Sequence, residues 1–116
     1  MVLKDNFYTI KASSIEANKA SFRIALQPEH FIYQAHFPNN PITPGVCLIQ
    51  MAKELFGVIK NANFEIKTLK NIKFIAPVNP LEFPEVDFLL EFLENNLKVL
   101  IKKNETVFAK MSLILN

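Results

Sequence analysis

Hydrophobic and polar residues alternate along several short segments of the chain, and this two-residue period is typical of β-strands. The clearest example is residues 20–26, where Phe22, Ile24 and Leu26 are separated by Ser21, Arg23 and Ala25. Prolines and asparagines separate several similar segments in the second half of the chain. The predicted strands cover residues 7–11, 20–26, 69–75, 85–93, 97–103 and 106–115.

One segment has a different period. From Val46 to about Lys60, hydrophobic residues recur at helical spacing, which predicts one long helix. Its broad apolar side is typical of a helix wrapped by a curved sheet. The apolar side contains Leu48, Ile49, Met51, Ala52, Leu55, Phe56, Val58 and Ile59, and the polar side contains Cys47, Gln50, Lys53, Glu54, Gly57 and Lys60. The order of elements therefore predicts an α+β fold in which an antiparallel sheet wraps around one central helix.

Candidate chemistry lies just before this helix, in the run His36-Phe37-Pro38-Asn39-Asn40-Pro41-Ile42-Thr43-Pro44-Gly45-Val46. Residues 27–44 are otherwise predicted to form a loop, with at most a short turn of helix near His30. The three prolines restrict the backbone, so we expect the loop to hold one shape and to present His36 at a defined place. An imidazole with a reference pKa of about 6.5 suits proton transfer near neutral pH. The N–H groups that begin the helix could stabilise an oxyanion beside it.

This run resembles the signature of the β-hydroxyacyl-(acyl carrier protein) dehydratases, which have the hot-dog fold. The resemblance implies that His36 removes the α-proton of a β-hydroxyacyl thioester, and that backbone N–H at Gly45 and Val46 binds the thioester carbonyl. Phe37 and Ile42 would line an acyl tunnel. The substrate would be carried on the phosphopantetheine of acyl carrier protein, with no metal or redox cofactor. The active assembly would be a homodimer or an oligomer of dimers, with the histidine and the helix acid of each site contributed by different subunits.

The chain departs from the family pattern at one position. Fourteen residues after the histidine the family carries its catalytic Glu or Asp, whereas this chain has Gln50. Three explanations stay open: Gln50 orients the substrate while His36 moves every proton, the chain binds acyl thioesters without converting them, or the acid has moved to Glu54. Glu54 lies four residues later and so shares a helix face with Gln50. The first and third explanations describe a dehydratase, which is the leading function. The alternatives are a non-catalytic acyl-thioester-binding subunit that pairs with an active homologue, or an acyl thioesterase.

Composition limits the partners, the cofactors and the location that this chain can have. The 116 residues are expected to form one domain, residues 1–116, and the net charge of +2 is too small to indicate a nucleic-acid partner. Two glycines exclude the glycine-rich nucleotide loops, and two histidines with one cysteine offer no metal site of the usual spacing. The single Cys47 excludes an internal disulfide. With no signal-peptide layout and no membrane-spanning stretch, we expect a cytoplasmic protein.

Overall fold

Within the part of the chain that the structure describes, the sheet contains six strands, and every neighbouring pair is antiparallel. The computed structural model describes residues 2–35 and 39–116. In chain order the strands are β1 (Tyr8–Ile15), β2 (Lys19–Leu26), β3 (Ile66–Phe74), β4 (Glu85–Leu93), β5 (Asn96–Lys103) and β6 (Thr106–Leu115). Their order across the sheet is β1-β2-β4-β5-β6-β3, so β1 and β3 form its two edges.

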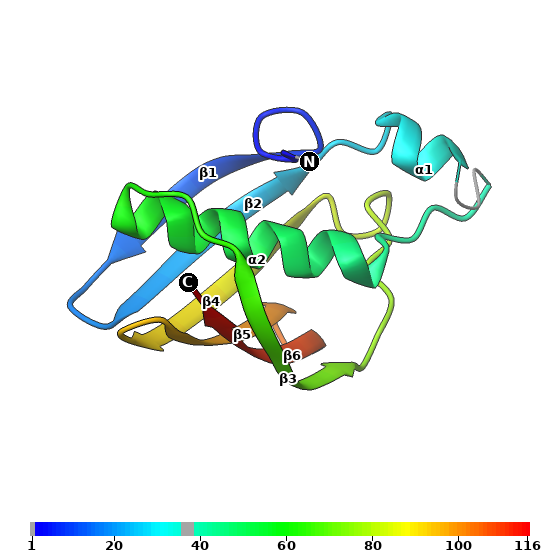
Figure 1. Cartoon of the computed structure of the whole chain (residues 1–116). Helices are drawn as coiled ribbons and strands as arrows, with labels where there is room; N and C mark the ends of the chain where they lie inside the picture. The colour runs from blue at the N-terminus through cyan, green and yellow to red at the C-terminus, as the bar shows by residue number, and fades with distance from the viewer. Residues whose placement is uncertain (1, 36–38) are drawn as a thin grey trace.

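Helix α2 (Gly45–Lys60) lies along one face of this sheet (Figure 1). Its buried side chains are Cys47, Leu48, Met51, Ala52, Leu55 and Phe56. They form one core with inward-facing residues of the central strands, such as Phe22, Phe88 and Ile101. Burying a side chain of this size stabilises the fold by about 1.5–3 kcal/mol. The predicted hot-dog arrangement, a sheet wrapped around one central helix, is confirmed.

Within the described residues the strand predictions are correct in number, and two of the predicted boundaries are wrong by more than one residue. The first strand runs to Ile15 instead of residue 11, because its polar second half lies at the exposed edge of the sheet and still pairs with β2. A register shift between Ile10 and Ala12 interrupts this pairing. Strand β3 begins at Ile66, three residues before the predicted start, and its register with β6 shifts twice. The alternation of hydrophobic and polar residues is weak in the edge strands β1 and β3, because the rest of the structure covers only the inner side of each.

The predicted faces of the long helix need two corrections. Cys47 belongs to the predicted polar side, but it is buried, and its burial raises the pKa of the thiol above the ordinary value. Val58 belongs to the predicted apolar side, but it is exposed. A helical wheel gives the direction of a side chain and not how much of the neighbouring structure covers each turn. No helix of the described residues is long and apolar enough to cross a membrane.

A short helix, α1 (Phe31–Ala35), forms where a turn of helix was expected. It begins directly after His30, whose Nδ1 accepts a hydrogen bond from the backbone N–H of Ile32 at 3.1 Å. The His30 ring also packs against the rings of Phe7 and Phe31, with centroids 5.1 and 4.6 Å away. These contacts give His30 a structural role at the start of α1.

Buried hydrogen bonds join the two sides of the segment that carries the histidine motif. The Thr43 hydroxyl donates to the carbonyl oxygen of Val78 at 3.0 Å. Its proton is therefore committed, so the Tyr33 hydroxyl, 2.8 Å away, must donate to Thr43 Oγ1. Tyr33 is fully buried and Thr43 is 4% exposed, so water cannot replace either partner. This chain of bonds fixes α1 against the residues that lead into α2.

We expect Thr43→Val to lower the free energy of unfolding by about 1–3 kcal/mol, because it leaves the buried Tyr33 hydroxyl without an acceptor. Tyr33→Phe should cost less, about 0.5–1.5 kcal/mol, because Thr43 keeps its bond to Val78. The double variant should cost less than the sum of the two single variants, since no polar group is then orphaned. Urea unfolding of the four proteins measures this cycle. Equal and additive losses would contradict the proposed direction of the hydrogen bonds.

Candidate active site

The polar side of α2 carries Gln50 and Glu54, the two residues on which the presence of a catalytic acid depends. Gln50 Nε2 donates a hydrogen bond to Glu54 Oε2 at 2.8 Å. The expectation that these residues share one helix face is therefore confirmed. Both side chains are half-buried, so this pair lies at the boundary between the core and the surface.

The Glu54 carboxylate also holds the N-terminal segment. The backbone N–H of Leu3 donates to Oε2 at 2.8 Å, and the backbone N–H of Lys4 donates to Oε1 at 2.9 Å. The Tyr8 hydroxyl donates to Oε1 at 2.8 Å. With Gln50, this makes two donors on each carboxylate oxygen. Because a proton on Glu54 would displace one of these donors, the arrangement favours Glu54 as an acceptor over Glu54 as a proton donor.

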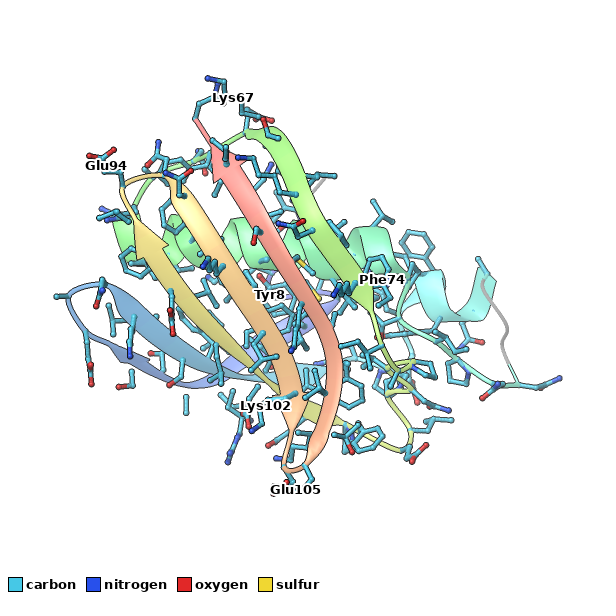
Figure 2. The ribbon with its side chains drawn as sticks, turned by 90° about the horizontal axis from the view of Figure 1, so that it is seen from below. Tyr8, Lys67, Phe74, Glu94, Lys102 and Glu105 are labelled. Atoms are coloured by element: carbon cyan, nitrogen blue, oxygen red, sulfur yellow. The ribbon has the colours of Figure 1, made fainter. Side chains whose placement is uncertain are left out.

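Tyr8 is the part of this network that sequence reasoning missed. In Figure 2 its side chain lies behind the strands, on the side of α2, and the residue is fully buried. Desolvation, with a smaller contribution from the Glu54 carboxylate, raises the pKa of Tyr8 far above its ordinary value. The hydroxyl therefore remains protonated and able to donate. A buried tyrosine hydroxyl needs a partner, but the sequence did not indicate that this partner lies 46 positions away.

The start of α2 has the features expected of an oxyanion site. The carbonyl of Pro44 accepts from the N–H groups of Cys47 and Leu48, at 2.9 and 3.3 Å. The N–H groups of Gly45 and Val46 come earlier in the first turn, where a helix offers no internal acceptor. Pro44, at the N-cap, makes no side-chain capping bond. These two N–H groups, at the positive end of the helix dipole, could therefore stabilise a developing negative charge.

Gly45 is required here by close packing. A Cβ atom at Gly45 would lie 2.5 Å from Cζ of Phe74. Phe74 ends β3 and lies beside the start of α2, as Figure 2 shows. Its side chain is nevertheless 55% exposed, and Val46 is 66% exposed. The helix start is thus flanked by apolar side chains that remain accessible.

The other predicted site residues are placed as follows. Ile42 is half-buried just before α2, a position compatible with either a core or a tunnel residue. His36 and Phe37 lie outside the described residues, so their predicted roles stay predictions. A surface groove of about 660 Å³ is lined by Gln50 and Glu54 together with Lys4, Lys53, Gly57 and Val58, among others. Within the described residues, no group of three His, Cys, Asp or Glu side chains could hold a metal ion.

Two curated relatives share part of the sequence. Both are named 3-hydroxyacyl-[acyl-carrier-protein] dehydratase FabZ. The protein from Caulobacter sp. (strain K31) is 32% identical over 57 residues, which cover 41% of this chain and 35% of that protein. The protein from Fusobacterium nucleatum is 34% identical over 67 residues, which cover 53% of this chain and 46% of that protein. The chain thus spans less than half the length of these relatives.

Solved structures share the fold. A chain of the dehydratase heterocomplex ApeI:P from Xenorhabdus doucetiae superposes with a TM-score of 0.76 at 18% identity, over 91% of this chain and 95% of that chain. An uncharacterized protein from Erwinia carotovora subsp. atroseptica gives a TM-score of 0.69 at 17% identity, over 94% and 95%. The family model for the ApeI dehydratase matches residues 12–112. Since that match covers most of the sequence, the chain belongs to the ApeI-like dehydratase family.

Proposed function

We propose that this protein is a 3-hydroxyacyl-thioester dehydratase that forms a trans-2-enoyl thioester and water, with its substrate carried on acyl carrier protein in the cytoplasm. The observation that carries the proposal is the start of α2, where Gly45 and Val46 offer two N–H groups directly after the histidine-proline run. Membership of the dehydratase family supports the same reaction. The accessible apolar side chains of Val46 and Phe74 fit an acyl chain beside the thioester.

In the proposed reaction His36 takes the proton from C2 of the substrate. Negative charge develops on the thioester oxygen, and the N–H groups of Gly45 and Val46 stabilise it. The C3–O bond then breaks, the C2=C3 double bond forms, and the hydroxyl leaves as water with the proton returned by His36. One imidazole can serve both steps because the reference pKa of histidine, about 6.5, lies near neutral pH. No external oxidant, reductant or metal is needed to balance this elimination.

Gln50 takes the role of an orienting group in this proposal. A neutral amide cannot supply the proton that the leaving hydroxyl needs, and general acid catalysis contributes a factor on the order of 10² to 10⁴. Glu54 is the carboxyl group next to Gln50, but its four donors favour its use as an acceptor. His36 is therefore the proton source that the reaction requires.

A second candidate function is a non-catalytic acyl-thioester-binding subunit that pairs with an active homologue. The observation in its favour is that neither polar residue of α2 is suited to donate a proton. Gln50 is not an acid, and the Glu54 carboxylate accepts hydrogen bonds from four donors. The similar solved structure is named as a heterocomplex, which is a precedent for pairing in that protein. This candidate requires neither His36 nor an acid.

Single-turnover assays with 3-hydroxyacyl-(acyl carrier protein) of several chain lengths separate the two functions. We expect wild type to form the enoyl product, and His36→Ala to lower the rate by a factor on the order of 10² to 10⁴. Gln50→Ala should lower it by about tenfold, as expected for one lost orienting hydrogen bond. Binding of the acyl carrier protein to each variant serves as the control. A wild type that binds every substrate but converts none would support the binding subunit instead.

A carboxylate introduced at position 50 should make stability depend on pH. In wild type, Gln50 Nε2 lies 2.8 Å from Glu54 Oε2. Gln50→Glu replaces this amide with a second carboxyl group within hydrogen-bond reach of Glu54. Like charges at this distance raise the pKa of one carboxyl group in the folded state. The folded state then binds more protons than the unfolded state, so stability falls as the pH rises from about 4 to about 7. Urea unfolding across this range measures the effect.

Gln50→Ala is the matched control, because it loses the same hydrogen bond without adding a charge. Its stability should follow the pH profile of wild type, displaced by a constant amount. Parallel profiles for Gln50→Glu and Gln50→Ala would show that the two carboxylates do not interact, which would contradict the contact between positions 50 and 54.

The accessible apolar surface near β3 leads us to expect a dimer in solution. Leu69 and Phe74 on β3 are 49% and 55% exposed, and Ile75, directly after the strand, is 55% exposed. Strand β3 is also an edge strand, with one side unpaired within the described chain. Light scattering should give about twice the 13.3 kDa mass of one chain. Leu69→Glu should shift the protein toward monomer. The control Leu93→Glu, at an exposed site on β4, should not. A monomeric wild type at micromolar concentration would contradict the expected dimer.

A further inference from the structure

We propose that the face of the sheet turned away from α2 is an interaction surface for a second copy of this chain, because the outward side chains of β4 and β5 complement themselves under a two-fold rotation. This inference goes beyond the proposed dehydratase function and does not depend on it. It also concerns a surface other than the exposed edge strand β3.

Strands β4 and β5 form the middle of this face. Every second residue of each strand is buried against the core, as Phe88 and Ile101 are, so the residues between them point to the opposite side. Figure 2 looks onto this face, with the strands in front of α2. Acids lie on one of these strands and lysines on the other, with leucines between them. The outward residues of β4 are Glu85, Asp87, Leu89, Glu91 and Leu93, and those of β5 are Asn96, Lys98, Leu100 and Lys102.

The register of the two strands makes the face self-complementary. Three successive outward pairs link them: Asp87 with Lys102, Leu89 with Leu100, and Glu91 with Lys98. A two-fold axis that runs between β4 and β5, parallel to both, would lay β4 of one copy over β5 of the other. Each acid would then face a lysine of the other copy, and the leucines would meet in the middle. One rotation thus matches all three rows, as a symmetric interface between identical chains requires.

The charges needed for this contact are available within one chain. Glu91 and Lys98 are both exposed, and the ion pairs of the described residues include neither of them. Lys102 likewise lies outside these pairs, although the Arg23 side chain binds Asp87 at 3.1 Å. An opposing copy would bring opposite charges together at a partly desolvated surface. Such pairing selects one arrangement of the two copies over others.

The middle of this face is also hollowed. A depression of about 480 Å³ is lined by Leu89, Leu100, Glu91 and Lys98, among others. It can receive side chains of an opposing sheet, since packed sheets lie about 10 Å apart with their side chains interdigitated. The matched rows cover on the order of 400 Å² of each copy, roughly half of a standard interface. The contact should therefore be weak, and it should add to the dimer expected through β3 only well above micromolar concentration.

A different axis, between β2 and β4, would also set acids against bases. It is less favourable, because it brings Leu89 of one copy against Ser21 of the other instead of against a leucine. The two axes differ in the lysine that faces Glu91 of the other copy. This lysine is Lys98 for the axis between β4 and β5, and Lys19 for the axis between β2 and β4.

Charge reversals test the proposed surface without any activity. We expect sedimentation equilibrium of wild type to give an average mass that rises with concentration between about 10 µM and about 1 mM. Glu91→Lys and Lys98→Glu should each raise the dissociation constant of this contact about tenfold, because each sets like charges against one another twice in a symmetric contact. An equal mixture of the two variants should associate as wild type does, since each reversed charge then faces its opposite.

Lys19→Glu is the matched control. It makes the same substitution at the other neighbour of Glu91, with a similar effect within the chain, but across the proposed axis Lys19 faces the uncharged Ser112. It should change the dissociation constant by less than about twofold and should not restore association when it is mixed with Glu91→Lys. A wild-type mass that is independent of concentration, or reversals without effect, would overturn the proposal and leave this face to solvent or to a different protein. Recovery in the mixture of Lys19→Glu with Glu91→Lys, and not in the mixture of Lys98→Glu with Glu91→Lys, would overturn it in favour of the other axis.

Discussion

The burial of α2 against one face of the sheet is the constraint on which the rest of this structure depends. Six side chains of the helix enter the core, so the helix cannot rotate without exposing them. Only the opposite strip is left for polar groups, and it carries Gln50 and Glu54. The same burial fixes where the helix begins, and therefore where the N–H groups of Gly45 and Val46 lie. The core thus determines the site geometry before any catalytic group is considered.

Two polar networks connect this core to the segments around it. Tyr33, Thr43 and Val78 join the residues on either side of the histidine motif through buried hydrogen bonds. Glu54 joins the N-terminal segment to α2. Both networks are satisfied, and in the described residues no buried side-chain polar atom lacks a partner. Such networks specify one arrangement of the chain, because each alternative would leave a buried donor or acceptor unpaired.

The Glu54 network gives a physical account of the departure from the dehydratase pattern. A carboxyl group that must donate and take back a proton cannot also hold three donors from the N-terminal segment in a constant arrangement. In this chain the carboxylate holds that segment, and an amide occupies the position nearer the start of the helix. The carboxylate one helical turn further along α2 thus has a structural task. The family's position carries no acid, and in the proposed reaction the proton transfers therefore fall to His36.

The sequence by itself determined the six strands, the long helix and the fold that they form, because the periods of two and 3.6 residues reflect which side of each element is buried. It also determined the candidate motif before α2 and the proximity of Gln50 and Glu54, because residues four apart on a helix are neighbours. It did not determine the extent of the edge strands, nor that Cys47 is buried and Val58 exposed, because coverage depends on elements distant in the sequence. The partners of Glu54 other than Gln50 were likewise decided by the tertiary structure alone. Two of them, the N–H groups of Leu3 and Lys4, belong to the backbone, and a backbone donor leaves no trace in the identity of the residue.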